Sequence, residues 1–159
     1  MPDNIYKIGK ELDTLVSSLK SQKRKIVFTN GVFDIIHRGH AAYLSEAKKL
    51  GDVLIVGLNS DSSVKRIKGS TRPVNNENDR AYVLVNLKPV DYVAIFEEDT
   101  PYNLIKSVVP DVLVKGGDWK AEEIVGSDIV TKSGGKVLSL SYIDNYSTTG
   151  ILKKISETK

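Results

Sequence analysis

The order of apolar and polar residues along this chain predicts an alternation of helices and strands. The first apolar residues recur at helical spacing with charged residues between them, which predicts an N-terminal helix over residues 1–22: they are Ile5, Ile8, Leu12, Leu15, Val16 and Leu19. Continuous apolar runs at 25–31 and 52–61 are typical of strands that are buried on both faces of a parallel sheet. Residues 40–51 lie between these runs and repeat apolar positions at helical spacing.

The same alternation continues to the end of the chain. Helices are expected at 62–69, 79–88, 100–108 and 147–155, the last of them capped by Ser147, and strands at 91–96, 111–117 and 136–142. Five strands that alternate with helices predict an α/β fold, a Rossmann-like, open, doubly wound parallel sheet with helices on both faces. Ligands of such sheets bind beyond the carboxyl ends of the strands, near the point where the strand order reverses.

Composition narrows the class of protein. The chain has 159 residues, enough for a single domain, which we expect residues 23–159 to form behind the N-terminal helix. Its 23 basic and 20 acidic residues are spread along the sequence, so no nucleic-acid partner is expected. Cysteine is absent, which excludes disulfides and zinc–thiolate sites. The start of the chain lacks the apolar core of a signal peptide, and we expect a cytoplasmic protein with no membrane partner.

The only two histidines, His37 and His40, stand three positions apart just after the first buried strand. Gly31 permits a tight turn there, Gly39 removes a side chain between the histidines, and a helix is expected to begin at about His40. Free amides at a helix start favour an anion, and two imidazoles would add hydrogen-bond donors aimed at it. The segment therefore predicts phosphate chemistry.

Two other interpretations of the histidine pair stay open. His40 can cap the helix while His37 packs in a loop, which is the commoner role of an isolated histidine. A metal site is the second alternative, but two histidines need at least one further ligand, and only Asp34 lies nearby, so no metal-binding side chains are expected.

Residues 31–40, GVFDIIHRGH, resemble the GxFDxxHxGH signature of the nucleotidyltransferase superfamily that contains the cytidylyltransferases. Further stretches extend the resemblance over residues 24–155: LNSDSSVKRIKG, TRPVN, PVDYV, FEEDTP, LVKGGDW and STT. Together they are most similar to the adenylyltransferase domain that makes ADP-heptose from heptose 1-phosphate. Many members carry this domain behind a sugar kinase, for which 159 residues leave no room, so the stand-alone form is expected.

The resemblance implies that His37 and His40 contact the nucleotide phosphates and stabilise the transition state. Asp34 would organise the loop that contains them. The backbone at the strand end would lie against the nucleotide, with four residues implied: Asn30, Gly31, Val32 and Phe33.

Basic residues near position 68 are implied to bind phosphate. Lys65 and Lys68 both stand where the family places a phosphate-binding lysine, and we expect Lys65 to be the main ligand, with a catalytic role, because it lies deeper in the predicted helix. Arg72 and Arg80 are further candidates, and a solvated charge is an equal alternative for each.

Two later segments are also implied to bind the nucleotide. In KGGDW, consecutive glycines let the backbone approach a flat ligand, Asp118 can accept hydrogen bonds from a ribose or base, and Lys115 and Gly116 complete the set. A Gly–Gly turn with Trp119 in the core is the alternative. The last helix start offers hydroxyls and amides for phosphate, although serine is common at any helix start: Ser147, Thr148 and Thr149.

The activity implied by the resemblance is transfer of AMP from ATP to a heptose 1-phosphate, with release of pyrophosphate. Mg²⁺ is expected, held mainly by triphosphate oxygens and water. Cytidylyltransferases of glycerol phosphate and phosphocholine carry an arginine five residues before Ser-Thr-Thr, where this chain has Tyr142, which favours the heptose branch. A cytidylyltransferase for a small phosphate and a nucleotide-binding module without turnover are the alternatives. We also expect a homodimer, formed through an edge element and the leading helix.

Overall fold

The fold is centred on strand β3 (Val53–Asn59), all of whose residues are buried in the computed structural model, which describes residues 2–141 and 146–158. It pairs in parallel with β2 (Ile26–Gly31) on one side and with β4 (Tyr92–Phe96) on the other. Beyond β2 the sheet continues with β5 (Val112–Gly116) and β6 (Lys136–Leu140). The continuous apolar runs at 25–31 and 52–61 predicted β2 and β3, because a strand covered on both faces has no polar side.

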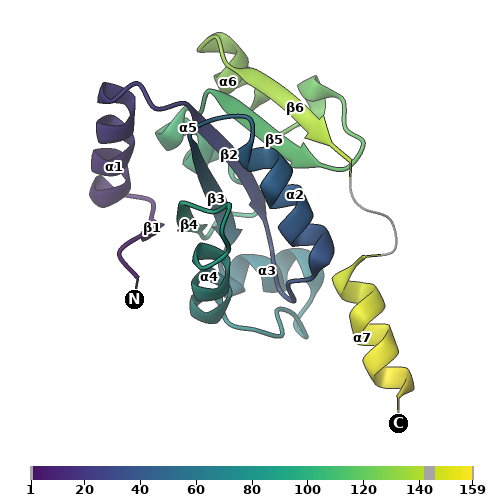
Figure 1. Cartoon of the computed structure of the whole chain (residues 1–159). Coiled ribbons are helices and arrows are strands. Elements are labelled where there is room, and N and C mark those ends of the chain that lie inside the picture. The colour runs from purple at the N-terminus through teal and green to yellow at the C-terminus, as the bar shows by residue number, and fades with distance from the viewer. Residues whose placement is uncertain (1, 142–145, 159) are drawn as a thin grey trace.

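Helices cover both faces of the sheet (Figure 1). Their bounds are α1 (Lys10–Ser21), α2 (Arg38–Lys48), α3 (Asp61–Lys68), α4 (Glu77–Val85), α5 (Tyr102–Val108), α6 (Ser127–Lys132) and α7 (Thr148–Glu157), with a 3₁₀ turn η1 (Ala121–Glu123). None of the helices within the described ranges is long and apolar enough to cross a lipid bilayer.

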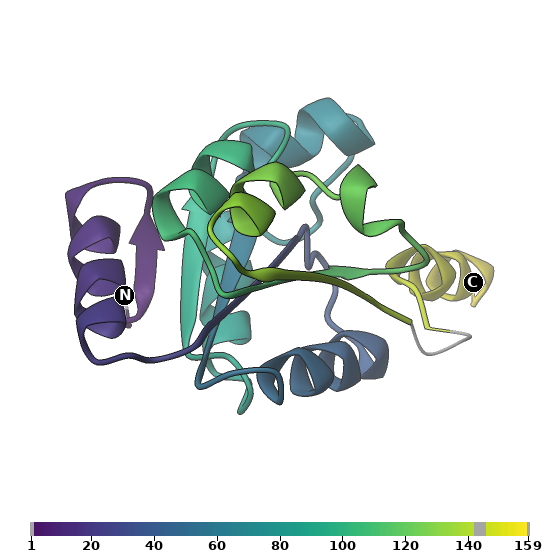
Figure 2. The same cartoon turned by 90° about the horizontal axis from the view of Figure 1, so that it is seen from above.

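Two hydrophobic cores form, one on each face. Leu44 of α2 and Leu84 of α4 are fully buried on one face together with Leu54 of β3. Leu12 of α1 packs on the other face, where α5 and α6 also lie, together with Ile55 of β3. Successive side chains of β3 thus feed opposite cores. Figure 2 shows α2, in blue, and α6, in light green, on opposite sides of the sheet, so the doubly wound architecture is confirmed.

The strand order locates a ligand site. The sheet runs β1-β4-β3-β2-β5-β6 and every pairing in it is parallel. From β2 the chain builds outward through β3 and β4 and then returns to the other side of β2 with β5. The order therefore reverses between β2 and β5, whose carboxyl ends are the expected ligand site.

The prediction of five strands and of a helix over residues 1–22 is wrong at the N-terminus. Ile5–Lys7 form β1, which pairs in parallel with β4, and the helix begins only at Lys10. Gly9, with a φ of 150°, separates the two elements. Ile5 packs against one core and Tyr6 against the other, as in a strand. Three residues are too few to display the strand period, so the helical spacing that includes Ile5 was misleading.

Candidate functional site

A cavity of about 460 Å³ lies beyond the carboxyl ends of β2 and β5, at the point where the strand order reverses. Its walls come from the loop after β2, the start of α2, the loop after α3, the end of β5 and the start of α7. Most of the residues proposed from the sequence line it: Asn30, Gly31, Val32, Phe33, Asp34, His37, His40, Lys68, Arg72, Lys115, Gly116, Ser147, Thr148 and Thr149. Lys65, Asp118 and Arg80 do not.

The two histidines cap α2 reciprocally. His37 is the N-cap, and its Nδ1 accepts a hydrogen bond from the Gly39 amide at 3.1 Å. The Nδ1 of His40 in turn accepts from the His37 amide at 3.4 Å. The helix therefore begins at Arg38, two residues earlier than expected, and the capping alternative had the roles reversed, because His37 rather than His40 is the cap.

This capping fixes the proton on each imidazole. Because both Nδ1 atoms accept from backbone amides, a neutral ring carries its proton on Nε2. The rings stack with centroids 3.9 Å apart, and both line the cavity. Burial, with a smaller contribution from His37, lowers the pKa of His40 to about 4, and burial also lowers the pKa of His37. At neutral pH each ring is uncharged and its only hydrogen-bond donor is Nε2–H.

Gly39 leaves room for this arrangement. It is buried, and a Cβ there would lie 3.0 Å from the His37 ring and 3.0 Å from the Cβ of Tyr146. The Tyr146 ring stacks on His37 with centroids 6.2 Å apart, and Arg38 lies 5.8 Å from the centroid of the same ring. Any side chain at position 39 would push the imidazole or the tyrosine away.

Two tyrosines in the lining were missed by the sequence reasoning. Tyr43 lies three residues after His40 on α2, and its hydroxyl is 2.6 Å from that of Thr29 on β2. The spacing to His40 was a usable signal for Tyr43, because residues three apart share a helix face. Tyr146 reaches the histidines only through the fold, and nothing in its local sequence indicates that contact.

Asp34, in the lining of the cavity, joins the loop after β2 to the loop after α3. Its carboxylate accepts hydrogen bonds from Arg72 Nε at 2.6 Å, from the Val74 amide at 2.8 Å and from the Asn75 amide at 3.0 Å. Burial alone would raise the pKa of Asp34, but the two amides and the guanidinium together lower it. Arg72 is therefore paired within the protein even though it lines the cavity.

Arg80 lies outside the cavity lining and forms hydrogen bonds to the same two loops. It is 2% exposed, and its guanidinium donates to the carbonyls of Asn75 and Val32 and to the Asp61 carboxylate at 2.6–2.9 Å. These bonds use all three guanidinium nitrogens. Both interpretations from sequence, a phosphate ligand and a solvated charge, therefore differ from what the structure shows.

Two lysines face the cavity. Lys68, the last residue of α3, and Lys115 on β5 both line it. The pKa of Lys115 is lowered, mainly by burial and to a smaller extent by the positive charge of Lys68. Lys65, the expected phosphate ligand, is exposed and lies outside the lining. Gly69 ends the helix directly after Lys68, so Lys68 stands next to the loop that borders the cavity, whereas Lys65 lies three residues earlier in the helix.

The remaining predicted segments flank the cavity. Asp118 is exposed outside the lining, and Trp119 is 48% exposed, so the alternative that buried Trp119 in the core is wrong. Ser147 caps α7 as predicted, its Oγ accepting from the Gly150 amide at 3.0 Å. Thr148 Oγ1 donates to the Ile35 carbonyl at 3.2 Å, which holds the start of α7 against the loop after β2. Tyr142 lies outside the described residues.

The side chains of this site do not form a metal-binding set. Across residues 2–141 and 146–158 no group of three or more histidine, cysteine, aspartate or glutamate side chains is placed to hold a metal ion. Asp34, the carboxylate in the lining, is already bound to Arg72 and two amides. A divalent cation here would need ligands from a bound anion.

Comparison with known proteins places the chain in a family. Its sequence matches the family described as Cytidylyltransferase-like over residues 28–153. The bifunctional protein HldE of a Nitratiruptor species is 55% identical over 153 residues, 96% of this chain and 32% of that protein. HldE of Citrobacter koseri is 56% identical over 147 residues, 92% of this chain and 31% of that protein. The chain thus spans about a third of the length of these relatives.

Two solved structures are similar to this chain in fold. The lipopolysaccharide core biosynthesis protein from Thermoplasma volcanium GSS1 is 36% identical with a TM-score of 0.65, covering 76% of this chain and 99% of that one. Pantoate-beta-alanine ligase from Francisella tularensis, complexed with beta-gamma ATP and beta-alanine, shares the fold with a TM-score of 0.59 at 18% identity, covering 96% and 78%. The family match includes both histidines, both cavity lysines and the start of α7, and the chain belongs to the cytidylyltransferase-like family.

Proposed function

We propose that this chain is a nucleotidyltransferase that transfers AMP from ATP to a heptose 1-phosphate, forming ADP-heptose and pyrophosphate. The observation that carries the proposal is the meeting of two neutral imidazole donors with Lys68 and Lys115 in one cavity beyond the strand ends. Family membership supports nucleotidyl transfer. The resemblance of TRPVN, KGGDW and the surrounding stretches supports the adenylyl group and the heptose.

The reaction is an in-line displacement. A phosphate oxygen of the sugar phosphate forms a bond to the α-phosphorus of ATP, and the bond from that phosphorus to the bridging oxygen breaks, so that pyrophosphate leaves with the electron pair. No covalent enzyme intermediate is needed. Catalysis comes from holding two anions together and from stabilising the charge that spreads over the phosphorus oxygens.

The histidines suit the role of fixed donors. Their Nε2–H groups stay protonated at neutral pH because each Nδ1 is committed to a backbone amide. Such donors need no reorganisation when charge develops on the α-phosphate, and a neutral ring neither gains nor loses a proton in the step. Lys68 and Lys115 supply the positive charge that favours the leaving pyrophosphate.

We expect Mg²⁺ to enter with the triphosphate. The lining fits a cation held by phosphate oxygens and water, because Asp34 is the one carboxylate among the described residues that line the cavity and it is already bound to Arg72 and two amides. When bound, the cation would neutralise phosphate charge beside the lysines. A homodimer and a cytoplasmic location stay predictions from the sequence.

The test is a pyrophosphate-release assay across nucleotides and sugar phosphates. We expect ATP with a heptose 1-phosphate to be turned over faster than CTP with glycerol phosphate. A preference for the CTP pair would favour the cytidylyltransferase alternative, which agrees with the description of the family as Cytidylyltransferase-like. Binding of nucleotide without pyrophosphate release from any pair would favour a module that binds and does not catalyse.

A further inference from the structure

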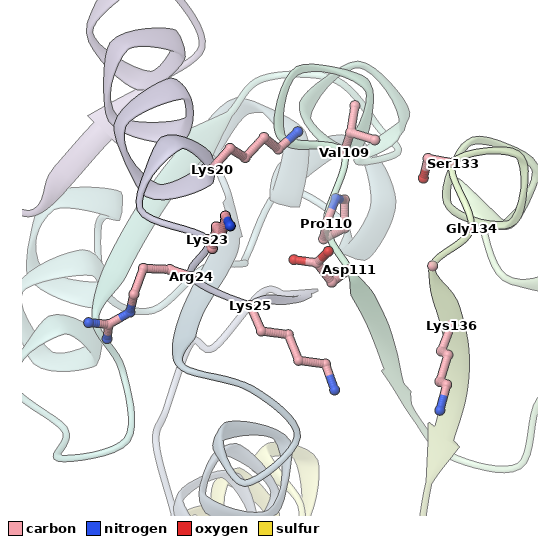
Figure 3. Close-up of a pocket in the computed structure, with 11 residues that line it drawn as sticks. Lys20, Lys23, Arg24, Lys25, Val109, Pro110, Asp111, Ser133, Gly134 and Lys136 are labelled. Carbon is pink, nitrogen blue, oxygen red and sulfur yellow. The ribbon is translucent and has the colours of Figure 1, made fainter.

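A second cavity lies at the opposite end of the strands that carry the candidate site. It has a volume of about 570 Å³ and lies at the amino ends of β2, β5 and β6, beside Lys25, Asp111 and Lys136 (Figure 3). The strands β2 and β5 border one cavity at each end. The proposed reaction uses no residue of this second cavity.

Lysines dominate its lining, and we call it the lysine pocket. Four exposed lysines border it: Lys20, Lys23, Lys25 and Lys136. Arg24 also borders it, but the guanidinium points away in Figure 3 and donates to the Asp52 carbonyl at 3.4 Å. The one carboxylate in the lining is Asp111, so four lysines and one aspartate leave a net charge of +3.

Asp111 supplies the single negative charge in this sum, and the backbone also holds its carboxylate. Its Oδ2 accepts a hydrogen bond from the Ile26 amide at 2.7 Å, which commits it to joining the starts of β2 and β5. Its charge acts on Lys20, whose pKa is nonetheless lowered because burial outweighs the attraction. Within residues 2–141 and 146–158, none of the ion pairs involves Lys23, Lys25 or Lys136.

Helix ends explain only part of the cluster. The helices α1, α5 and α6 all end beside the pocket, and a helix carboxyl end carries about half a negative charge, which favours nearby cations. This accounts for Lys20 and Lys23 at the end of α1. Lys25 and Lys136 stand at the starts of strands, and three helix ends contribute at most about −1.5, less than the charge of the lining.

We propose that the lysine pocket binds a compact anion that carries two or more phosphate groups. Gathering unpaired like charges destabilises the protein unless an anion offsets them, and a net charge of +3 is best matched by a multivalent one. The site is concave and its volume is within the range of small-ligand pockets, whereas surfaces that bind other proteins are broad. A small polyphosphate fits this description better than an acidic protein surface does.

Inorganic tripolyphosphate is the probe. It is titrated into the full chain at about 20 mM and about 150 mM salt while backbone amide resonances are followed by NMR. We expect the amides of Lys25 and Lys136 to shift at both salt concentrations. In a Lys25→Ala/Lys136→Ala variant, the tripolyphosphate concentration that half-saturates the shifts in these regions should rise about tenfold or more, since two charge-assisted contacts are lost. Shifts around His40, which belongs to the candidate phosphate site at the other end of the strands, should persist.

The matched control is Lys10→Ala/Lys88→Ala, which removes the same charge from two exposed lysines outside both cavities. It should bind like the wild type. Equal weakening in both variants would mean that only net charge matters and would overturn the proposal. The proposal would also be overturned if the amides of the lysine pocket did not shift with tripolyphosphate but shifted with a polyglutamate peptide. That result would identify the pocket as a surface that binds acidic proteins. Unchanged pyrophosphate release by Lys25→Ala/Lys136→Ala would show that this site and the catalytic one are separate.

Discussion

The two ends of β2 and β5 present phosphate-binding chemistry in two different forms. At the carboxyl end the polar groups are fixed by the protein: backbone amides hold His37 and His40, and Asp34 is bound by Arg72. At the amino end, the pocket around Lys25 consists of exposed lysines on flexible stems, without ion partners among the described residues save the pull of Asp111 on Lys20. Fixed donors can favour one geometry of a reacting phosphate, whereas mobile cations recognise charge alone. We therefore expect catalysis at one end only.

Removing either histidine should separate the two ends most clearly. His37→Ala or His40→Ala is expected to lower kcat by about two to three powers of ten, the usual effect of losing one transition-state donor, with a smaller change in ATP affinity. Pyrophosphate release measures the loss, and circular dichroism confirms folding, since His37 also caps α2. The Lys25→Ala/Lys136→Ala variant serves as the control with normal turnover. A folded histidine variant with wild-type kcat would reduce that residue to a helix cap.

A comparison of Lys68 with Lys65 tests which lysine contributes to the site at the carboxyl ends of β2 and β5. Both side chains are exposed, but Lys68 lines the cavity and Lys65 lies outside it. Lys68→Ala is expected to lower kcat/KM for ATP by about tenfold or more, because Lys68 lines the cavity in which the phosphates are proposed to bind. Lys65→Ala is expected to lower it by less than about twofold, because solvent and salt screen a charge that lies outside the cavity. The constants are compared across ionic strength. A larger loss with Lys65→Ala would restore the assignment made from the sequence.

Adding one methyl group at Gly39 should displace the His37 imidazole or Tyr146 without removing a hydrogen-bond donor from the candidate site. The new Cβ would lie 3.0 Å from the His37 ring and from the Cβ of Tyr146, so one of them must move. We expect Gly39→Ala to lower kcat roughly five- to tenfold, the effect of a small displacement of a catalytic group. Ser45→Ala, at an exposed position of the same helix, is the control. Unchanged kcat would show that the imidazole position is not critical.

The smallest effect is a pH dependence of stability. The pKa of His40 is about 4 in the folded chain against 6.5 for the free side chain, so the unfolded chain binds more protons between these values. The stabilisation is complete above pH 6.5 and is lost as the pH falls toward 4, by about 1–2 kcal/mol after allowance for partial exposure. Urea unfolding at pH 7 and pH 4.5 measures it. His40→Gln, which keeps an acceptor without titrating, should lose this component, and an unchanged pH slope would contradict the assignment.

Much of the sheet and the centre of the site could be predicted from the sequence because their signals are local. A continuous apolar run predicts a strand covered on both sides, and GVFDIIHRGH contains both the strand end and the helix cap. The three-residue strand β1 escaped prediction because only its pairing with β4 identifies it.

The residues that were missed or misplaced depend on distant partners. Arg80 bonds to Val32, 48 positions away, and to Asp61, 19 positions away, so its burial has no local signal. Tyr146 meets His37 only because the start of α7 lies against the loop after β2. The choice between Lys65 and Lys68 depended on where the helix ends relative to the cavity, which its sequence spacing does not specify.

The short strand β1 has a consequence for the association of the molecule with itself. It occupies the outer hydrogen-bonding edge of β4, where Val93 and Ile95 are almost wholly buried. Uncovered, that edge would offer free amides and carbonyls beside apolar side chains, the usual template for strand-to-strand polymerisation. β1 replaces it with an edge of three residues that ends at the exposed charge of Lys7. The first strand of the chain thus protects the β4 edge of the sheet from pairing with a strand of another molecule, a role that is separate from nucleotide chemistry.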